Sequence, residues 1–293
     1  RPPRSTLFPY TTLFRSDEEN ERWYYANGDG EIASGEIKKI KGKYYGFYPE
    51  GTKKAGAMLT GLCALRVTAD GTIDEVIAGD MDGDDLDDCM DNKGDFEGKM
   101  DDASLYYFGN DEDSDGAMKT GSTTISLDGD SHSFMFSKTG GAEGRGKGLT
   151  GIDDNKYIYK YGKRIKADSD EKYVVVYADG DTGSDSAVVK EVDSADLRKL
   201  ADKDGVGRNK DGDTVRFVGK EGVTWNTNYY LVNTSGSIQK GKTAAKDGDD
   251  WFFYTEDNHV VMYTNNKTLK DDSKKGYELD VNFDNWKKWS SEI

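Results

Sequence analysis

The stretch SLYYFGNDEDSDGAMKTG, residues 104–121, decides the fold that this sequence predicts. It opens on an aromatic run from Tyr106 to Phe108, passes through an acidic turn that ends at Gly116, and closes on a Thr-Gly pair. Successive residues of a β-strand point to opposite faces, so Tyr106 and Phe108 are expected on one face and Tyr107 on the other. Two short strands joined by a polar turn with glycine fit this pattern. The stretch therefore predicts a β-hairpin.

Variants of this hairpin recur along the chain, and neighbouring units start about 21–28 residues apart, a spacing typical of repeat proteins. A lone hairpin is marginally stable in water, so the units are expected to stack and to bury their rings against one another. The sequence therefore predicts an all-β protein of stacked β-hairpin repeats, solenoid-like, with a small insertion that carries one short helix. The aromatic runs of the clearest units begin at Trp23, Tyr44, Tyr106, Phe134, Tyr157, Tyr229 and Trp251.

Stretches that break the repeat divide the chain into segments. An acidic run from Asp80 is expected to form a solvated loop. A helix is expected near 194–203, with Asp193 or Ser194 as its cap, because Leu197, Leu200 and Ala201 share a face there. The predicted segments are 1–16, an artefact; 17–60, hairpin repeats; 61–103, a β segment with the acidic loop; 104–167, hairpin repeats; 168–224, divergent β-strands or an insertion; and 225–293, hairpin repeats and a C-terminal segment.

The first sixteen residues, RPPRSTLFPYTTLFRS, match the in-frame translation of a common sequencing-library adapter. We therefore leave them out of the fold prediction, as for any segment that comes from processing or cloning. The natural sequence is expected to begin near Asp17, in the middle of a longer protein.

The composition excludes some classes of function. The formal net charge of −16 opposes binding to nucleic acids and to anionic membrane surfaces, which attract basic proteins. No stretch approaches the roughly 18 apolar residues that a membrane-spanning helix needs. Hydrophobic residues make up only 34%, yet the chain has 18 Tyr and 35 Gly, which favours many short hairpins with stacked rings over one aliphatic core.

With its units aligned, the chain resembles the cell-wall-binding repeat proteins of Gram-positive bacteria, which include choline-binding and glucan-binding repeats. The typical unit of that family is Gly-Trp, then Gly-x-Trp-Tyr-Tyr-Phe, a polar turn with glycine, and Met-x-Thr-Gly. The matching stretches are SLYYFGNDEDSDGAMKTG from Tyr106 to Gly121, NYYLVNTSGSIQKG from Tyr229 to Gly241, and RWYYANGDGEIASG from Trp23 to Gly35.

The resemblance implies an extracellular protein, secreted or on the bacterial surface, whose repeats hold it to the cell wall. In choline-binding members, two strand aromatics and a Met form a cage for a quaternary amine. No Gly-Trp dipeptide occurs here, so the expected partner is a cell-wall polymer or another polysaccharide. The ligand-binding residues that this implies are Trp23, Tyr25, Tyr44, Tyr45, Tyr106, Tyr107, Phe108, Met118, Tyr229, Tyr230 and Trp251.

No cofactor is expected, and only weak binding of divalent cations. The acids of DEDSDG, Asp111, Asp113 and Asp115, fit the first half of a calcium loop, but Ser122 stands where the loop needs a bidentate Glu. Cys63 and Cys89 are in no Cys-x-x-Cys pair, and whether they form a disulfide stays open. His132 and His259 are each expected to have a surface or strand role.

Three functions compete at this point. The preferred one is a non-catalytic module that anchors a surface or secreted protein by multivalent aromatic contacts with a polysaccharide. The second is a structural spacer or adhesion stalk, which would follow if every ring were buried. The third is a surface hydrolase, with its active site in 61–102 or 168–224 or with a catalytic domain upstream, which would need convergent carboxylates.

Overall fold

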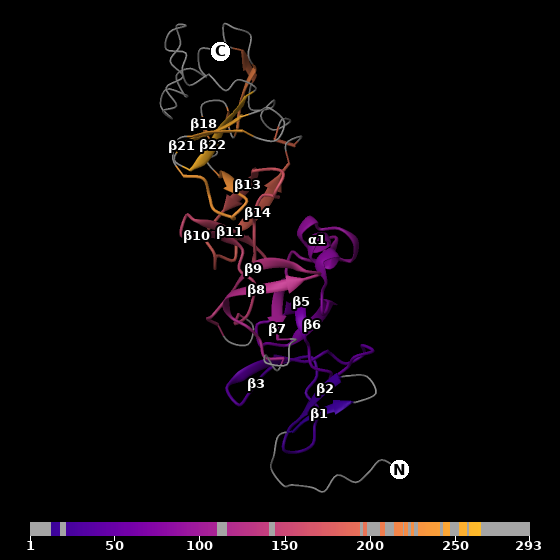
Figure 1. Ribbon diagram of the computed structural model, residues 1–293. Helices are drawn as coiled ribbons and strands as arrows, with labels where there is room; N and C mark the ends of the chain where they lie inside the picture. The colour runs from indigo at the N-terminus through magenta and orange to yellow at the C-terminus, as the bar shows by residue number, and fades with distance from the viewer. Residues whose placement is uncertain are drawn as a thin grey trace. The chain divides into compact units, whose positions relative to one another are not determined.

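The protein is seen in a computed structural model, drawn in Figure 1. The chain divides into two compact units, Arg1–Leu149 with Tyr161–Lys163 and Thr150–Lys160 with Arg164–Ile293. The residues that the structure describes are 13–17, 22–109, 116–140, 144–193, 196–197, 206–208, 214–218, 220–221, 224–225, 228–240, 243–246, 252–256 and 258–264.

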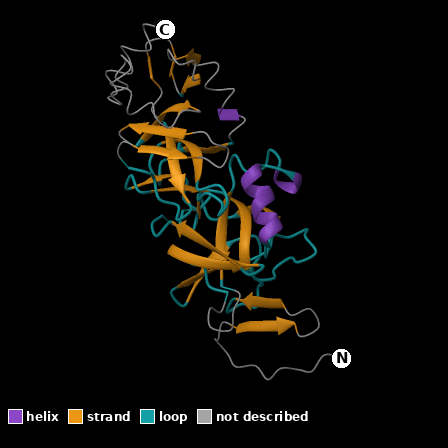
Figure 2. Ribbon diagram, turned by 45° about the horizontal axis from the view of Figure 1, so that its top comes forward, coloured by secondary structure: helices purple, strands orange, loops and turns teal. Residues whose placement is uncertain are grey.

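The described residues form antiparallel strands joined by turns, together with one short α-helix (Figure 2). The predicted all-β fold of hairpin sheets is therefore confirmed. Glycines and polar residues separate the strands, and paired aromatic and β-branched residues fill them, as strand propensities require.

The strands of the first unit pair in antiparallel fashion. β1 pairs with β2, β3 with β4, and β8 with β9, while β5 lies between β6 and β7. Leu13–Ser16 belong to β1. The strands are β1 (Leu13–Asp17), β2 (Arg22–Ala26), β3 (Ile37–Ile40), β4 (Lys43–Gly46), β5 (Gly61–Val67), β6 (Ile73–Ala78), β7 (Ser104–Phe108), β8 (Gly121–Leu127) and β9 (Asp130–Phe136).

The second unit holds a large antiparallel sheet in the order β14-β13-β19-β22-β16-β15, to which the β20–β21 hairpin is joined through β22. β10 pairs with β11, and β17 with β18. The strands are β10 (Gly151–Asp153), β11 (Tyr157–Lys160), β13 (Tyr173–Asp179), β14 (Val188–Val192), β15 (Val206–Arg208), β16 (Thr214–Phe217), β17 (Lys220–Glu221), β18 (Thr224–Trp225), β19 (Tyr229–Asn233), β20 (Thr243–Lys246), β21 (Phe252–Glu256) and β22 (His259–Thr264), and β12 (Lys163–Arg164) lies where the chain passes between the units.

A six-residue pattern, Gly-x-x-x-x-Gly, closes five of the repeats, and we call each copy a closing hexapeptide. Every first glycine has a positive φ, between 70° and 86°, which residues with a Cβ rarely adopt. The pattern therefore turns the chain back at the same point of each repeat. The copies are GEIASG (30–35), GAMLTG (56–61), GAMKTG (116–121), GKGLTG (146–151) and GSIQKG (236–241).

The third residue of a closing hexapeptide connects two repeats. It forms a β-bridge with the aromatic strand of its own repeat, as Met118 does with Phe108. Its N–H then donates to a carbonyl of an earlier repeat, as Met118 does to Tyr44 at 2.8 Å. These bonds fix the stacking register of neighbouring repeats. The donor and acceptor pairs are Met58 to Trp23 (2.7 Å), Met118 to Tyr44 (2.8 Å), Gly148 to Leu105 (2.8 Å) and Ile238 to Lys156 (2.9 Å).

The side chain of this third residue lies against the first glycine of the next hexapeptide. A Cβ built on Gly116 would lie 2.9 Å from Met58 Sδ, and one built on Gly146 would lie 2.6 Å from Met118 Cγ. These distances are too short for a real Cβ, so the methionine side chain would have to shift if either glycine gained one. The contacting pairs are Ile32 with Gly56, Met58 with Gly116, and Met118 with Gly146.

The acidic run that we predict to be a loop from Asp80 forms helix α1 (Gly83–Asp91), followed by the 3₁₀ turn η1 (Gly94–Phe96). That prediction is wrong because the many acids hide a helical period: Leu86, Cys89 and Met90 lie at i, i+3 and i+4. All three are buried, and the acids between them face solvent.

Capping residues set the ends of α1. The Asp82 side chain accepts a hydrogen bond from the Asp85 N–H at 2.9 Å, and the Gly83 N–H donates to Asp128 Oδ2 at 2.7 Å. Two of the N–H groups at the start of the helix therefore meet carboxylate oxygens. At the other end, Asn92 adopts the left-handed conformation that stops a helix.

The predicted strands at 173–192 are confirmed by β13 and β14, which pair from Val175 opposite Val192 to Asp179 opposite Val188. The helix predicted near 194–203 is described only at Asp196 and Leu197, which are helical. Asp193 caps it as expected, because its side chain accepts from the Asp196 N–H at 2.7 Å.

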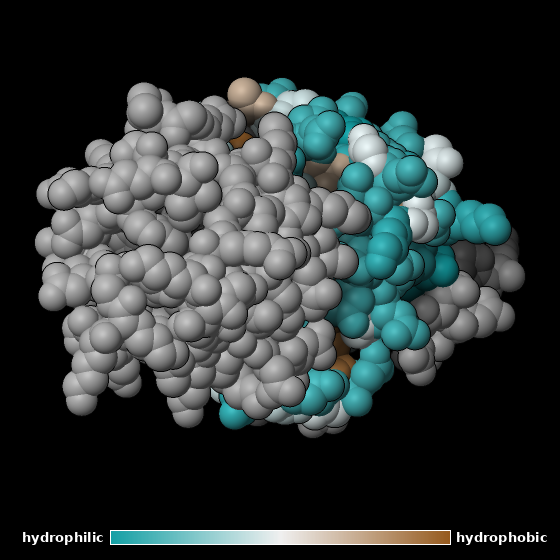
Figure 3. Space-filling view, turned by 90° about the horizontal axis from the view of Figure 1, so that it is seen from above, coloured by the Kyte–Doolittle hydropathy of each residue, from teal (hydrophilic) through white to brown (hydrophobic). Residues whose placement is uncertain are grey.

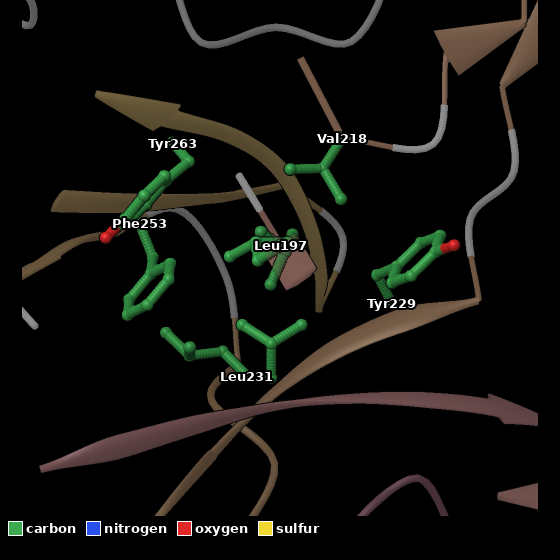
Figure 4. Packing of buried hydrophobic residues seen from close by; sticks show 8 residues of the cluster. Leu197, Val218, Tyr229, Leu231, Phe253 and Tyr263 are labelled. Atoms are coloured by element: carbon green, nitrogen blue, oxygen red, sulfur yellow. The ribbon is translucent and has the colours of Figure 1, made fainter. Parts of the chain in front are cut away.

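The core of the second unit gathers on the large sheet (Figure 4). Leu197 from the helical turn points among side chains of β19, β21 and β22, and Tyr229 lies at the edge of this group. The buried members are Val175, Leu197, Val218, Tyr229, Leu231, Phe253, Val260 and Tyr263.

The described surface on the face drawn in Figure 3 is mostly hydrophilic. This agrees with a chain that is 33% charged. Among the described residues, no helix has both the length and the apolar character that crossing a membrane requires.

Candidate ligand-binding site

The bonds between repeats identify equivalent strand positions without reference to residue type. We call the strand residue whose carbonyl accepts from a closing hexapeptide the acceptor position. Trp23 and Tyr44 occupy it in the first two repeats. The motif alignment in the sequence analysis places Tyr106 opposite Trp23. The Gly148 N–H donates to the Leu105 carbonyl, however, so Leu105 is equivalent to Trp23 and the alignment is wrong by one residue. The acceptor residues are Trp23, Tyr44, Leu105 and Lys156.

Trp23 is the most exposed of the predicted ring residues that the structure describes. Its side chain is 47% exposed on β2, whereas its neighbour Tyr24 is half-buried. Among the residues that the structure describes, the exposed large hydrophobic side chains are Trp23, Ile32 and Val188. An exposed indole offers a flat apolar face on which a sugar ring can stack.

Tyr44 is half-buried at the same position of the next repeat. It packs against a core cluster that Met118 also contacts. Lys39 Nζ lies 5.7 Å from the centre of the Tyr44 ring, and the Arg145 guanidinium lies 5.5 Å from it. These are cation–π distances. We call Tyr44, Met118, Lys39 and Arg145 the Tyr44 site.

Tyr157 forms a third partly exposed ring, next to an acceptor position. Lys156 Nζ lies 4.8 Å from the ring centre and the Arg164 guanidinium 4.5 Å from it. A hydrogen bond from Lys156 and the charges of both cations lower the pKa of Tyr157. We call Lys156, Tyr157 and Arg164 the Tyr157 site.

Most of the other predicted rings are buried, because strands such as β7 pack on both faces. Tyr25 lies 6.2 Å from Phe47 in a core cluster, and Tyr230 packs 4.7 Å from the His259 ring. These rings hold repeats together and cannot stack on a ligand without unfolding. The buried members of the predicted set are Tyr25, Tyr45, Tyr106, Tyr107, Phe108, Tyr229 and Tyr230.

Some predicted residues lie outside the part of the chain that the structure describes. They are Trp251 and the weak calcium candidates Asp111, Asp113 and Asp115. Within the described residues, no three His, Cys, Asp or Glu side chains gather closely enough to hold a metal ion.

The two cysteines are both buried and are not joined by a disulfide. Burial raises the pKa of the Cys63 thiol to about 12, and burial together with nearby negative charge raises the pKa of Tyr48 to about 12. Both groups are therefore protonated at neutral pH. His132 and His259 lie in β9 and β22, half-buried, which confirms their strand role.

Sequence reasoning missed the cations that surround the rings, namely Lys39, Arg145, Lys156 and Arg164. Their contacts join residues far apart in sequence, such as Tyr44 and Arg145, so no local sequence pattern predicts these contacts. The closing hexapeptide was available as a signal. Aligned on it, Arg145 stands where the other copies have Asp29, Ala55, Asp115 and Ser235.

No family model and no curated protein matches this chain. Among solved structures, it is similar to choline binding protein F from Streptococcus pneumoniae, with 17% identity, 85% of this chain and 78% of that one covered, and a TM-score of 0.34. It is also similar to the modular autolysin LytC from Streptococcus pneumoniae, solved with a synthetic peptidoglycan ligand, with 15% identity, 85% and 42% coverage and a TM-score of 0.29.

Proposed function

We propose that this chain is a non-catalytic extracellular module that binds a cell-wall polymer or another polysaccharide through several weak aromatic sites. The observation that supports it best is the repetition of a ring that is not fully buried, Trp23 and then Tyr44, at one structural position of successive repeats. A polymer also repeats, so it can contact both rings at once.

Each site is expected to be weak by itself. One sugar stacked on one ring gains only about 1 kcal/mol, because a single stacking contact covers little apolar area. Linked sites on one chain raise the effective concentration for the second contact, and avidity then exceeds the affinity of either site. The bonds from Met58 and Met118 keep the two positions in a fixed register.

The proposal is tested by retention of the full chain on purified Gram-positive cell walls and on insoluble glucans. Trp23→Ala is expected to remove about 1 kcal/mol of stacking, which is about a fivefold loss of affinity. Val188→Ala is the matched control, because Val188 is also apolar and exposed, at 41%, but lies on β14. If no wall or glucan retains the chain, the proposal is wrong.

A structural spacer is the second candidate, and the burial of seven predicted rings favours it. A spacer needs rings only as packing between repeats. The spacer function predicts that Trp23→Ala changes neither stability nor retention, because an exposed ring contributes little to packing between repeats. The same retention experiment therefore separates the two functions.

A further inference from the structure

Lys156 and Arg164 replace apolar residues at two positions that the repeats define. The acceptor position holds Trp23 and Tyr44 in earlier repeats and Lys156 here, where Lys156 O accepts from the Ile238 N–H at 2.9 Å. The strand register agrees, since Tyr157 bridges Ser237 as Tyr24 bridges Ala57.

Arg164 makes the second of these contacts, although it lies in β12 and not in one of the five closing hexapeptides. A Cβ built on Gly236 would lie 2.7 Å from Arg164 Cδ, just as one built on Gly56 would lie 2.9 Å from Ile32 Cγ2. In the earlier repeats an Ile or a Met rests on the first glycine of the next closing hexapeptide, and here an arginine rests on it. One boundary between repeats has therefore exchanged both of its apolar residues for cations.

The two cations have no acidic partner within the described part of the chain. Neither Lys156 nor Arg164 forms an ion pair with any carboxylate described, although the chain has 56 acidic residues. Both lie over Tyr157, at 4.8 Å and 4.5 Å from its ring centre. The charges that act on the Tyr157 hydroxyl are both positive and lower its pKa.

This group is open to solvent. Lys156 is exposed, and Tyr157 and Arg164 are half-buried. An arginine presents a planar fork that binds carboxylate or phosphate oxygens in pairs, and a lysine adds a compact charge beside it. The Tyr157 ring beneath them holds both cations close together through cation–π contacts.

We propose that Lys156, Tyr157 and Arg164 form a subsite for an anionic group, a carboxylate or a phosphate diester, carried by a polysaccharide. The proposal rests on the polysaccharide-binding function above and names the class of polymer. The net charge of −16 repels such a polymer from most of the surface, so binding is expected to concentrate at this cationic subsite.

The test measures binding of the full chain to three soluble polymers: polygalacturonate for carboxylate, poly(glycerol phosphate) for phosphate diester, and dextran as the neutral probe. The Lys156→Gln/Arg164→Gln variant is compared with Lys172→Gln/Lys190→Gln, which removes the same charge from exposed residues of the same compact unit. Thermal unfolding of both variants checks that they fold.

The subsite predicts that the wild type binds at least one anionic polymer. Two lost charge-assisted bonds are expected to weaken that binding at least about tenfold in Lys156→Gln/Arg164→Gln, and the control variant should lose less than about twofold. Which anionic polymer binds tells carboxylate from phosphate.

An equal loss in both variants means general charge attraction and overturns the subsite, as does failure of the wild type to bind either anionic polymer. In both cases, retention on walls that still depends on Trp23 would leave the proposed function standing. The two proposals therefore fail separately.

Discussion

The first glycine of a closing hexapeptide such as Gly116 is constrained in two ways, by its positive φ and by a side chain close to its Cα. Comparison with other glycines separates the two effects. Gly116 has φ of 70° and lies against Met58, whereas Gly98 has φ of 69° with open space where a Cβ would be. Gly28 has neither constraint, because it has no positive φ and no atom within 4 Å of a built Cβ. The expected cost of an alanine substitution therefore rises from Gly28 to Gly98 to Gly116.

We predict that Gly28→Ala is neutral and that Gly98→Ala costs about 1 kcal/mol in unfolding free energy from backbone strain. Gly116→Ala is expected to cost more, about 2 kcal/mol, since the end of the Met58 side chain must also shift. Urea unfolding of each variant measures these costs. Adding Met58→Ala to Gly116→Ala should recover part of the loss, and no recovery would show that the side chain is not the obstacle.

Cys63 gives a pH dependence with a definite sign. Burial raises the pKa of its thiol from 9.0 to about 12, so the unfolded chain loses this proton first as the pH rises. The stability that this thiol confers is complete below pH 9 and declines between pH 9 and about 12.

We therefore predict that unfolding free energy falls more steeply above pH 9 in the wild type than in Cys63→Ala. The difference in slope is about 1.4 kcal/mol per pH unit for one group that titrates only in the unfolded state. Urea unfolding at pH 7.5, 9.5 and 10.5 measures it. Parallel curves for the two proteins would contradict the assignment.

At the scale of the element, α1 shows how an acidic sequence can still form a helix. Acids in the first turn, Asp84 and Asp85, are favourable near the positive end of the helix dipole, while no basic residue offsets the negative end. The helix therefore depends on its buried side and on the cap from Asp82.

Replacing the cap tests this dependence. Asp82→Ala removes the acceptor for the Asp85 N–H and is expected to cost about 1 kcal/mol of stability. Asp82→Ser keeps a capping oxygen and should stay within about 0.5 kcal/mol of the wild type. Urea unfolding, followed by circular dichroism, compares the two variants. An equal loss for Ala and Ser would mean that the aspartate acts by charge and not as a cap.

Features that depend on local interactions could be predicted from the sequence, and features that depend on contacts between distant residues could not. Hairpins such as β13–β14 depend on local alternation and on turn residues, and they were predictable. Helix α1 differs from the predicted loop because the many acids of this stretch hide the apolar period of Leu86, Cys89 and Met90. The rings were found but not their exposure, because a ring such as Tyr106 is buried by distant repeats. The pairing of Tyr44 with Arg145 depends on stacking register, which local sequence does not state.

At the scale of the whole molecule, the central claim is that rings at one structural position act together on a polymer. Trp23 and Tyr44 have their carbonyls bonded by Met58 and Met118, so the same register that stabilises the fold also spaces the rings. The backbone bonds of the closing hexapeptides therefore set the spacing of the two rings that we propose to bind polymer.

The most direct measurement is the affinity of the full chain for purified cell walls in four proteins: the wild type, Trp23→Ala, Tyr44→Ala and the double variant. The account predicts about a fivefold loss for each single variant and a further loss in the double variant, with unfolding free energy little changed in Trp23→Ala. Val188→Ala should bind as the wild type does. Equal retention of all four proteins would contradict the claim that these rings bind polysaccharide.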